Sequence, residues 1–498
     1  MDKVILNGRD LTVTQIIKAA RHDAYVELDE EALALASEAR NIVLEKSGCG
    51  KQIYGLNTGL GGNKDSHVPP EHYRKFNERI IFSHSVALPP YAPKDLVRAT
   101  MLIRLNGFLN AAAGIQPGAL NLLCDMLNAG IHPRIPVKGS VGMSDLGNMA
   151  YLGLAMIGKG VVEYMDRKME ASEALKLCAL KPLTLGIKDG LPIVSSNAFS
   201  VAAGALICHD TEQILNMSDL LYAIEYEALN LSPAFLNMRS CEKYRHRGYY
   251  ESMERVNRYL SGSALWENEN TSLECALSHS SSCAIHGAVR DSLGYIKQQL
   301  PLYINSSDDC PTVLHEERDI ISSSNFIITG LAIGFEMLDI ALAHLSKCTA
   351  NRLLRLCNER FSRLPRFLRP EAEVIAYSTI QKTISSLDGQ ISHLASPASL
   401  YYLPTANEAE DHGCNTPYVM EKTREILELL YLLLGAEAMH AAQAADVAGR
   451  PPTGRGTAYA YREIRKIIPK MTDDNRDLGA DICSAGELIR KGAILPTE

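Results

Sequence analysis

Apolar residues recur at intervals of three and four along most of this 498-residue chain, and this periodicity constrains its fold more than any other feature. The spacing is typical of helices that bury one face, and it is clear in segments 29–46 and 95–114. Short alternating segments, VILNG and LTVTQII, occur only near the start. Longer helical candidates follow at about 146–159, 198–230, 272–300, 319–358, 373–395 and 417–446. The sequence therefore predicts a mainly α fold, a bundle of long helices with a small mixed N-terminal region.

Segment 319–358 is apolar around most of its circumference, whereas a helix in a single surface layer would show one polar face. We expect this segment at the centre of a large bundle, where it can also pack between subunits. Segments 52–66 and 131–145 carry glycine and proline and are expected to be loops. We divide the chain into an N-terminal region with an active-site loop, 1–110, and a central helical bundle with C-terminal helices, 111–498.

Composition and charge exclude several classes of function. The formal net charge is -8, and the basic residues are spread out rather than gathered into the patch that nucleic-acid binding requires. The twelve cysteines are scattered, without a Cys-x-x-Cys pair, so they are expected to be reduced core thiols. No apolar leader opens the sequence, and no uninterrupted apolar run reaches membrane-spanning length. We expect a cytoplasmic protein without nucleic-acid or membrane partners.

Motifs for metals and nucleotides are weak. The glycines of 48–62 do not form a strand-to-helix phosphate loop, and the sequence His315-Glu316-Glu317 lacks the second histidine of a zincin helix. His279 and His286 are seven residues apart, which can place them on one helix face, but two core histidines are the better interpretation. Neither a metal nor a nucleotide is expected.

Five separated segments resemble the histidine/phenylalanine ammonia-lyase family, in the family's order. They are YGLNTGLGG at 54–62, RIIFSHSVAL at 79–88, RLNGFLNAAAGIQP with PVKGSVG within 104–142, ISSSNF at 321–326, and SPASLYYLPTANEAEDHG at 396–413. The similarity extends from about residue 4 to about residue 450, too far for a single shared motif to explain it. The resemblance implies a fumarase/aspartase-like long-helix bundle, a small-molecule substrate, and a homotetramer in which three subunits build each active site.

One departure from the family is as informative as the match. Family members that release ammonia read GSVGASGDL where this chain reads GSVGMSDL at 139–146. In the family the Ala-Ser-Gly triad cyclises into an electrophilic methylidene-imidazolone, whereas here Met143 stands at the alanine position and the residue best aligned with the glycine is missing. Glycine is needed there because its amide must approach the preceding carbonyl closely. We therefore predict that no electrophile forms and that the protein uses no cofactor.

The missing electrophile changes the expected substrate. Ammonia leaves poorly from an amino acid, and the family's electrophile bonds to the nitrogen to help it depart. A quaternary ammonium has no lone pair for that bond, yet it already leaves as a neutral tertiary amine. The resemblance thus predicts a carbon–nitrogen lyase that eliminates trimethylamine from a betaine, with ergothioneine, the betaine of 2-thiohistidine, favoured as substrate and thiourocanate as product.

Two alternatives stay open from the sequence. The protein could be an ordinary histidine or aromatic amino-acid ammonia-lyase, or an aminomutase, whose loop still cyclises. It could also be a non-catalytic scaffold descended from a lyase. The retention of Tyr54, Asn197 and Glu410 on three distant segments argues against the scaffold.

Removal of a weakly acidic β-proton requires a positioned base and a group that stabilises charge on the ring. Tyr54 occupies the place of the family's catalytic tyrosine, and a phenol with a pKa of about 10 needs nearby positive charge to act as a base. Lys382 lies on a helix that the resemblance points into the site, so it could supply this charge or protonate the substrate. Tyr54 could instead only pack under its loop, and Lys382 could be a solvated surface residue. An aromatic cage for the ammonium with Tyr401 or Tyr402 is also open.

Glu410 aligns with the glutamate that faces the imidazole in histidine lyases, and a carboxylate can hold or protonate such a ring. Its charged neighbours Glu408, Asp411 and His412 leave open a loop with no catalytic part. Lys382 and Glu410 could also titrate as a coupled pair.

Four residues are expected to bind substrate. Asn197 matches the family asparagine that holds the polar end of the amino acid, and His84 and Phe326 fall on family pocket positions, where either could also be a core residue. The family's YSLRC element reads TSLEC at 271–275, so Glu274 replaces the arginine that clamps the carboxylate. An acid there would repel a carboxylate and favour a cationic substrate head.

Overall fold

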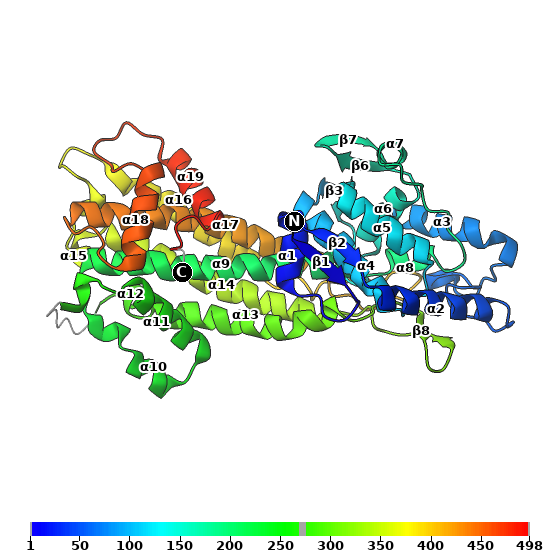
Figure 1. The fold of residues 1–498 in the computed structure, drawn as a ribbon. Helices are drawn as coiled ribbons and strands as arrows, with labels where there is room; N and C mark the ends of the chain where they lie inside the picture. Colours follow the sequence, from blue (N-terminus) through cyan, green and yellow to red (C-terminus); the bar gives the residue numbers. More distant parts are fainter. Residues whose placement is uncertain (1, 268–274, 497–498) are drawn as a thin grey trace. The chain divides into compact units, whose positions relative to one another are not determined.

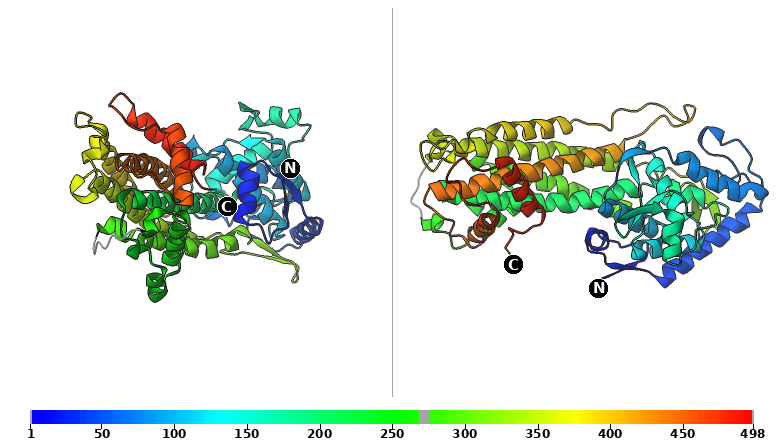
Figure 2. Two further views of the ribbon diagram at one scale, coloured as in Figure 1. Left: turned by 60° about the vertical axis from the view of Figure 1, so that its left-hand side comes forward. Right: turned by 90° about the horizontal axis from the view of Figure 1, so that it is seen from above.

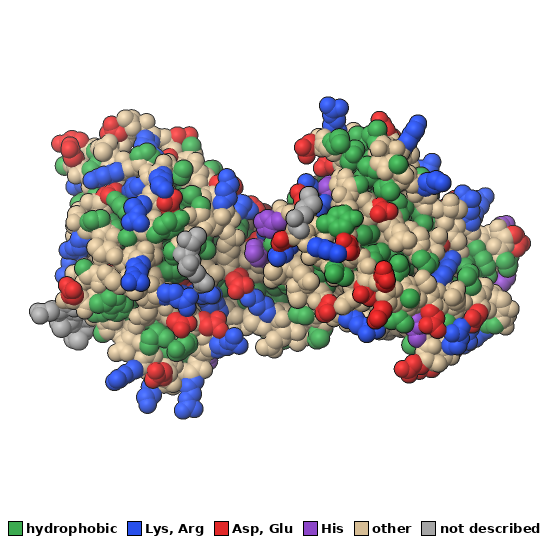
Figure 3. Space-filling view, viewed as in Figure 1, with side chains coloured by type: hydrophobic (Ala, Val, Ile, Leu, Met, Phe, Trp, Pro, Cys, Tyr) green, Lys and Arg blue, Asp and Glu red, His purple; other side chains and the backbone are tan. Residues whose placement is uncertain are grey.

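The computed structural model describes residues 2–267 and 275–496, which form two compact units. The first unit comprises Met1–His209, Ile296–Phe335 and Pro397–Glu421. The second comprises Asp210–Tyr295, Glu336–Ser396 and Lys422–Glu498. Because each unit is built from three separate stretches of chain, no single cut, at residue 110 or elsewhere, divides one from the other. On the visible face of each unit acidic and basic side chains are intermixed (Figure 3).

Helices dominate both units, so the predicted mainly α fold is confirmed (Figure 1). The longest are α9 (Ala198–Leu229), α13 (Ser282–Ile304), α14 (Thr329–Leu356) and α17 (Thr416–Val447), and each has residues in both units. Within the second unit the segments of α9, α14 and α17 run side by side with α16 (Ile380–Leu394) (Figure 2). The other helices of the second unit are α10 (Met238–Tyr244), α11 (Arg247–Tyr259), α12 (Leu277–Ser280), α15 (Glu359–Ser362), α18 (Arg455–Ile467) and α19 (Leu478–Arg490).

The first unit combines shorter helices with small sheets. Its helices are α1 (Val13–Arg21), α2 (Glu30–Ser47), α3 (Tyr73–His84), α4 (Lys94–Leu109), α5 (Pro117–Ala129), α6 (Leu146–Met156), α7 (Ala171–Leu177) and α8 (Gly190–Val194). The sheets pair β1 (Lys3–Leu6) with β2 (Tyr25–Leu28), β3 (Leu88–Tyr91) with β5 (Pro136–Lys138), and β8 (Thr312–Leu314) with β9 (Asp319–Ile321), while β6 (Val161–Tyr164) joins β4 (His132–Pro133) to β7 (Arg167–Glu170). Helices α3, α6 and α8 pack against one another and form a framework for the site described below.

The N-terminal mixed region differs from the sequence pattern in one place. The segment VILNG supplies strand β1, which pairs in parallel with β2, as alternation predicts. The second alternating segment, LTVTQII, instead opens helix α1. Thr12 and Gln15 form a capping box there, in which each side chain accepts a hydrogen bond from the other residue's backbone amide. The cap satisfies the free amides of a helix start, and this outweighs a short alternating pattern.

The helix predicted over 319–358 begins ten residues late. Residues Asp319–Ile321 form strand β9, antiparallel to β8, and α14 starts only at Thr329. The intervening segment contains three serines followed by Asn325, and such side chains compete with the backbone for helix hydrogen bonds. This segment forms part of a cavity wall instead of a helix.

Helix α14 keeps an apolar stripe exposed along its length. Ile333, Met337 and Ile340 are 56%, 38% and 48% exposed, and their spacing of four and three places them on one helix face. Two segments, Gly190–Leu229 and Thr329–Leu356, are long and apolar enough to cross a membrane, although the sequence shows no uninterrupted apolar run of that length. In the first segment, 94% of the most apolar 18-residue stretch is buried, so this segment belongs to the core. In α14 the buried share of the corresponding stretch is 56%.

A buried ion-pair network holds the helices of the second unit together. The Arg352 guanidinium on α14 donates to Glu225 on α9 at 3.0 Å and also pairs with Glu437 on α17, and all three side chains are fully buried. Burial, followed by the nearby charge of Glu437, raises the pKa of Glu225 well above its ordinary value. One guanidinium therefore compensates two carboxyl groups that have no access to water.

Next to this network, His286 contacts Asp219 at 2.8 Å, and Arg290 donates to the same carboxylate at 2.5 Å. His279 is also buried, so both histidines are core residues. Among the described residues, no cluster of His, Cys, Asp and Glu could hold a metal ion.

We expect Arg352→Met to destabilise the protein by about 3–5 kcal/mol, because the variant leaves Glu225 and Glu437 buried without a cation. Urea unfolding followed by circular dichroism measures the change in the free energy of unfolding. The matched control is Arg318→Met, since Arg318 pairs with Glu45 at 2.6 Å on the surface. There we expect a change below about 0.5 kcal/mol. Equal effects of the two substitutions would contradict a structural role for the buried network.

Candidate active site

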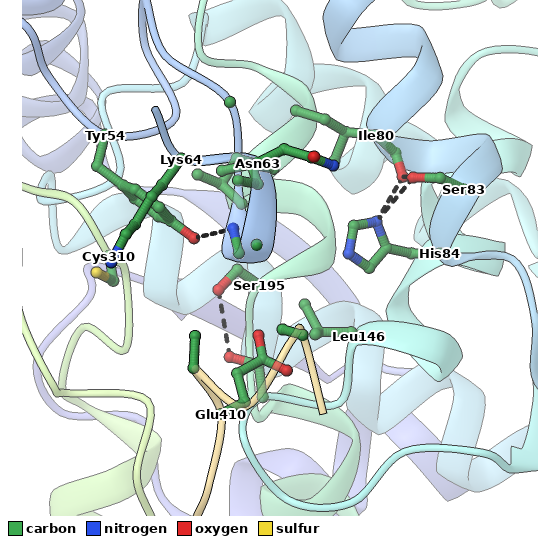
Figure 4. Close-up of a pocket in the computed structure, with 18 of the residues that line it drawn as sticks. Tyr54, Asn63, Lys64, Ile80, Ser83, His84, Leu146, Ser195, Cys310 and Glu410 are labelled. Atoms are coloured by element: carbon green, nitrogen blue, oxygen red, sulfur yellow. Dashed lines mark hydrogen bonds between the residues drawn. The ribbon is translucent and has the colours of Figure 1, made fainter. Parts of the chain in front are cut away.

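A cavity of about 930 Å³ lies in the first unit (Figure 4). Its walls come from the loop 54–68, one face of α3, the loop that precedes α6, and the loops 310–326 and 406–410. These segments are distant in sequence, and together they carry most of the motifs that resemble the lyase family. The cavity therefore gathers residues that sequence analysis singled out separately.

The loop that carries Tyr54 is held by its own hydrogen bonds. The Asn57 side chain accepts from the Ile53 amide at 2.8 Å, and backbone bonds from Gly59 to Ser66 (2.8 Å) and from Val68 to Asn57 (2.9 Å) close the loop. Glycine is required at position 59, because a Cβ there would lie 2.2 Å from a backbone oxygen. The motif YGLNTGLGG is thus a folded loop that presents the tyrosine to the cavity.

The Tyr54 hydroxyl accepts a hydrogen bond from the Gly61 amide at 3.0 Å. Burial raises the pKa of Tyr54, the Gly61 hydrogen bond lowers it, and the nearby Cys310 and Glu410 side chains raise it further. The net direction is upward, which opposes the phenolate form that a base requires. Tyr54 can act as a base only if a cation approaches it.

Glu410 projects into the same cavity (Figure 4). Its carboxylate accepts a hydrogen bond from the Thr405 hydroxyl at 2.8 Å, and its backbone carbonyl accepts one from the Tyr402 hydroxyl at 3.1 Å. The charged neighbours on the loop, Glu408, Asp411 and His412, are exposed and are absent from the cavity wall. The fold thus separates Glu410 from the rest of its charged loop and brings it to the cavity of Tyr54.

His84 lies at the end of α3 and lines the cavity. Its Nδ1 is 2.7 Å from the Ile80 carbonyl, which only accepts, so Nδ1 carries the proton. In the neutral ring Nε2 is then an acceptor. Phe326 also lines the cavity, so both family pocket positions reach the wall.

Asn197 is 1% exposed and lies behind the cavity wall rather than on it. Its side-chain amide donates to the Phe326 carbonyl at 2.9 Å, and its backbone amide donates to Asp308 at 2.5 Å. Its Oδ1 has no hydrogen-bond donor among the described residues. Asn197 therefore braces Phe326 and keeps one acceptor available.

Two aspartates, the buried Asp145 and the partly buried Asp308, tie the start of α9 to the cavity. Asp145 accepts from the Ser200 amide at 2.7 Å and from the Ser200 hydroxyl at 2.9 Å. Asp308 accepts from the Ser196 hydroxyl at 2.9 Å and pairs with Arg104 on α4 at 3.1 Å. Carboxylates at a helix N-terminus satisfy free amides and favour the helix dipole. Burial nevertheless raises the pKa of Asp145 to about 7.

The loop with the altered triad joins this anchor. The Asp145 backbone amide donates to the Ser196 carbonyl at 2.8 Å, and Ser144 adopts a φ of +61°. Met143 is 8% exposed and forms a β-bridge with Ile327. The amide two residues after Met143 is therefore already engaged in a hydrogen bond.

Three of the residues predicted from sequence lie elsewhere. Lys382 is exposed in the first turn of α16, in the second unit, whereas the described residues that line this cavity all belong to the first. Tyr401 is 76% exposed, and neither it nor Tyr402 belongs to the cavity wall. Glu274 lies outside the described residues.

The cavity also contains residues that sequence reasoning missed, namely Lys64, Phe76, Arg79 and Cys310. Phe76 and Arg79 share one face of α3 with Ile80, a face that the helical period could have identified. Lys64 lines the cavity, and its side chain extends toward Cys310 (Figure 4). It follows the Gly-rich motif directly and is a cation on the same loop as Tyr54.

Comparison with known proteins agrees with this geometry. Residues 11–466 match the model of the aromatic amino acid lyase family, and the chain belongs to that family. It is therefore a carbon–nitrogen lyase of the ammonia-lyase type.

The relatives carry two names. The chain is 33% identical to a histidine ammonia-lyase of Treponema denticola, over 98% of this chain and 96% of the relative. Among solved structures it is similar to ergothionase from Treponema denticola, an ergothioneine-degrading enzyme in complex with desmethyl-ergothioneine sulfonic acid, with 36% identity, full coverage of both chains and a TM-score of 0.96. It is also similar to histidine ammonia-lyase from Trypanosoma cruzi, with 25% identity, coverage of 99% and 94%, and a TM-score of 0.91.

We expect Tyr54→Phe to reduce lyase turnover at least about 100-fold, as is typical when an acid–base group is lost, while the fold stays intact. Steady-state kinetics with circular dichroism checks both points. Tyr25→Phe is the matched control, because Tyr25 is 47% exposed on β2 and distant from the cavity wall. Near-normal turnover by Tyr54→Phe would remove this residue from the chemistry.

Proposed function

We propose that this protein eliminates trimethylamine from ergothioneine to give thiourocanate, and that it does so without a methylidene-imidazolone. The observation that carries the proposal is the loop 139–146, which is built in a way that does not suit formation of the electrophile. The likeness to ergothionase over the full chain supports the choice of substrate.

Cyclisation of the family triad joins the amide nitrogen of its third residue to the carbonyl carbon of its first. In this chain the corresponding amide, that of Asp145, donates to Ser196 at 2.8 Å and is not directed at Met143. Met143 is itself held by its bridge to Ile327. The residues present do not fit the prosthetic group, and no step of the proposed reaction uses it.

The proposed reaction is a 1,2-elimination. A base removes one proton from the β-carbon, the electron pair of that C–H bond forms the double bond between the α- and β-carbons, and the C–N bond breaks. Its electrons leave on nitrogen, so trimethylamine departs as a neutral molecule. No activation of the leaving group is needed, which removes the reason for an electrophile.

In this reaction Tyr54 is the base and Glu410 faces the ring. A carboxylate can accept a ring N–H hydrogen bond and stabilise the charge that develops when the proton leaves. His84, with Nε2 as an acceptor, and Phe326 complete the wall around the ring. Asn197 donates to the Phe326 carbonyl and so supports this wall from behind.

The substrate carboxylate needs a cation, because Glu274 stands where the family has its clamping arginine. Among the described cavity residues, Lys64, Arg79 and His84 are the basic side chains. Lys64 lies on the same loop as Tyr54 and lines the cavity next to Cys310 (Figure 4). We assign the substrate carboxylate to Lys64, because a charge-assisted hydrogen bond between an ammonium group and a carboxylate is strong.

We further propose a cytoplasmic homotetramer with shared active sites. The apolar stripe of Ile333, Met337 and Ile340 on α14 suits burial against another copy, since large exposed apolar faces commonly mark interfaces. A neighbouring subunit would bring Lys382 to the cavity, where it supplies positive charge to lower the pKa of Tyr54.

An ordinary histidine ammonia-lyase is the second candidate, because curated relatives carry that name at 33% identity. It would require the loop 139–146 to cyclise in spite of its hydrogen bonding. A non-catalytic scaffold is disfavoured because Tyr54, Glu410 and His84 share one cavity.

Incubation with ergothioneine, histidine betaine, histidine and tyrosine separates these functions. We expect trimethylamine and a conjugated acrylate chromophore from ergothioneine, and no ammonia from either amino acid. The intact mass should equal the mass of the sequence, because cyclisation would remove two water molecules. Ammonia release, or a mass lower by two waters, would overturn the proposal.

For Lys64→Met we expect KM for ergothioneine to rise at least about 10-fold, since a charge-assisted contact to the carboxylate is lost. With the methyl ester of ergothioneine the wild type and the variant should differ little, because the ester has no charge to pair. Lys75→Met is the control, as Lys75 is exposed on α3 and absent from the cavity wall. Equal losses on acid and ester would refute the assignment.

Sharing of the site can be tested by complementation. Lys382→Met and Tyr54→Phe should each lower turnover at least about 100-fold as pure variants. Co-expression of the two should restore part of the activity, because some sites then combine an intact Tyr54 with an intact Lys382 from another subunit. Absence of restoration, with mixed oligomers verified by mass spectrometry, would contradict shared sites.

A further inference from the structure

A second cavity, of about 430 Å³, lies within the second unit. It is lined by Leu229 at the end of α9 and Leu231 beyond it, by residues around α12, and by the end of α14 with α15. It shares no described residue with the cavity of Tyr54, and the residues assigned to the proposed elimination within that cavity do not line it.

The described charged residues that line this cavity are all arginines. Arg355, Arg360 and Arg363 line it, and among the described lining residues there is no aspartate or glutamate. Within the described part of the chain no ion pair joins any of the three guanidinium groups to a carboxylate, whereas nearby Arg366 pairs with Glu359 at 2.9 Å. The acid beside the cavity is thus already used, and among the described residues no carboxylate pairs with any of the three arginines.

The arginines are placed by local structure. The Arg355 guanidinium lies 4.3 Å from the centre of the Phe361 ring, a cation–π contact that holds it at the cavity. Arg363 adopts a φ of +59° directly after α15, so the chain turns sharply there. Leu229, Leu231 and Phe361 supply apolar surface next to the positive charge.

His279 is a second, independent indication of a ligand. It lines the cavity, it is 3% exposed, and its Nε2 has no hydrogen-bond partner among the described residues. The nearest charged oxygen, on Glu225, is 3.8 Å away, beyond hydrogen-bond distance. Burial and the charges of Arg352 and Arg355 lower the pKa of His279 to about 3, so the ring is neutral.

We propose that this arginine pocket, formed by Arg355, Arg360, Arg363 and His279, binds a small organic anion. The ligand carries a carboxylate or a phosphate monoester that meets the arginines, and a compact apolar body that contacts Leu229, Leu231 and Phe361. The His279 Nε2 forms a hydrogen bond with a polar atom of the ligand. The volume falls within the range of about 300–1,000 Å³ in which proteins bind small molecules.

Calorimetry on the full-length protein tests this with benzoate, phenyl phosphate, inorganic phosphate and the neutral benzamide. We expect one of the two aromatic anions to bind, and the benzoate and phenyl phosphate arms to show whether a carboxylate or a phosphate is preferred. Benzamide should bind at least about 10-fold more weakly, and added salt should weaken binding of the anion.

Variants locate the site. Arg360→Met and Arg363→Met, both at exposed side chains, should each weaken binding of the aromatic anion at least about 10-fold. Arg366→Met is the matched control, because Arg366 is a neighbouring arginine that is paired with Glu359. Lys64→Met should leave the affinity unchanged, which separates this site from the first cavity.

Four results would overturn the proposal. They are no binding of either aromatic anion, equal weakening by Arg366→Met, loss of binding in Lys64→Met with retention in the Arg360 and Arg363 variants, and inorganic phosphate binding as tightly as both aromatic anions. Circular dichroism and size-exclusion chromatography check that each variant is folded. If either variant fails to fold, wild-type binding of benzoate and of benzamide is compared at two salt concentrations. This comparison decides whether the site prefers an anionic ligand.

Discussion

The anchoring of α9 at its N-terminus is the constraint on which the rest of the site depends. Asp145 and Asp308 meet there from different loops, and each satisfies groups at the start of the helix. The same contacts fix Asn197, which in turn holds Phe326 in the cavity wall. One helix start therefore sets the positions of three loops, and the cavity is the space these loops leave between them.

This anchor also determines what chemistry the loop 139–146 can support. The Asp145 amide donates to Ser196 and so stabilises the fold, and the proposed reaction does not require this amide to cyclise. In the proposed reaction the enzyme does not have to activate the leaving group, and its main task is to remove a β-proton. Positive charge near Tyr54 then matters more than in a lyase with an electrophile, since burial alone raises the pKa of this phenol.

Much of the fold and part of the site could be predicted from sequence. Long helices were found because a period of 3.6 persists over many turns, and Tyr54, His84, Phe326 and Glu410 were found because they lie in motifs. Short segments were less predictable: in LTVTQII one cap outweighed the alternating pattern.

Lys64 was missed for a different reason. Its side chain reaches the cavity only because hydrogen bonds between residues 57 and 68 fold the loop, and no periodic pattern encodes that direction. Lys382 was assigned from resemblance; it is exposed on α16 in the second unit, whereas the described cavity residues belong to the first, so its part in the site stays a prediction.

The closed loop that carries Tyr54 and Lys64 has a kinetic consequence. Backbone hydrogen bonds join Asn57 to Val68 around Lys64, and the Gly61 amide ties the Tyr54 hydroxyl to the same loop, so the two side chains are held by one set of contacts. In the proposed reaction Tyr54, which is the base, and Lys64, which binds the substrate carboxylate, then move together. Opening of the loop would release the acrylate and withdraw Tyr54, the proton donor, in the same movement. An amine still in the cavity would then have no acrylate to which it could add.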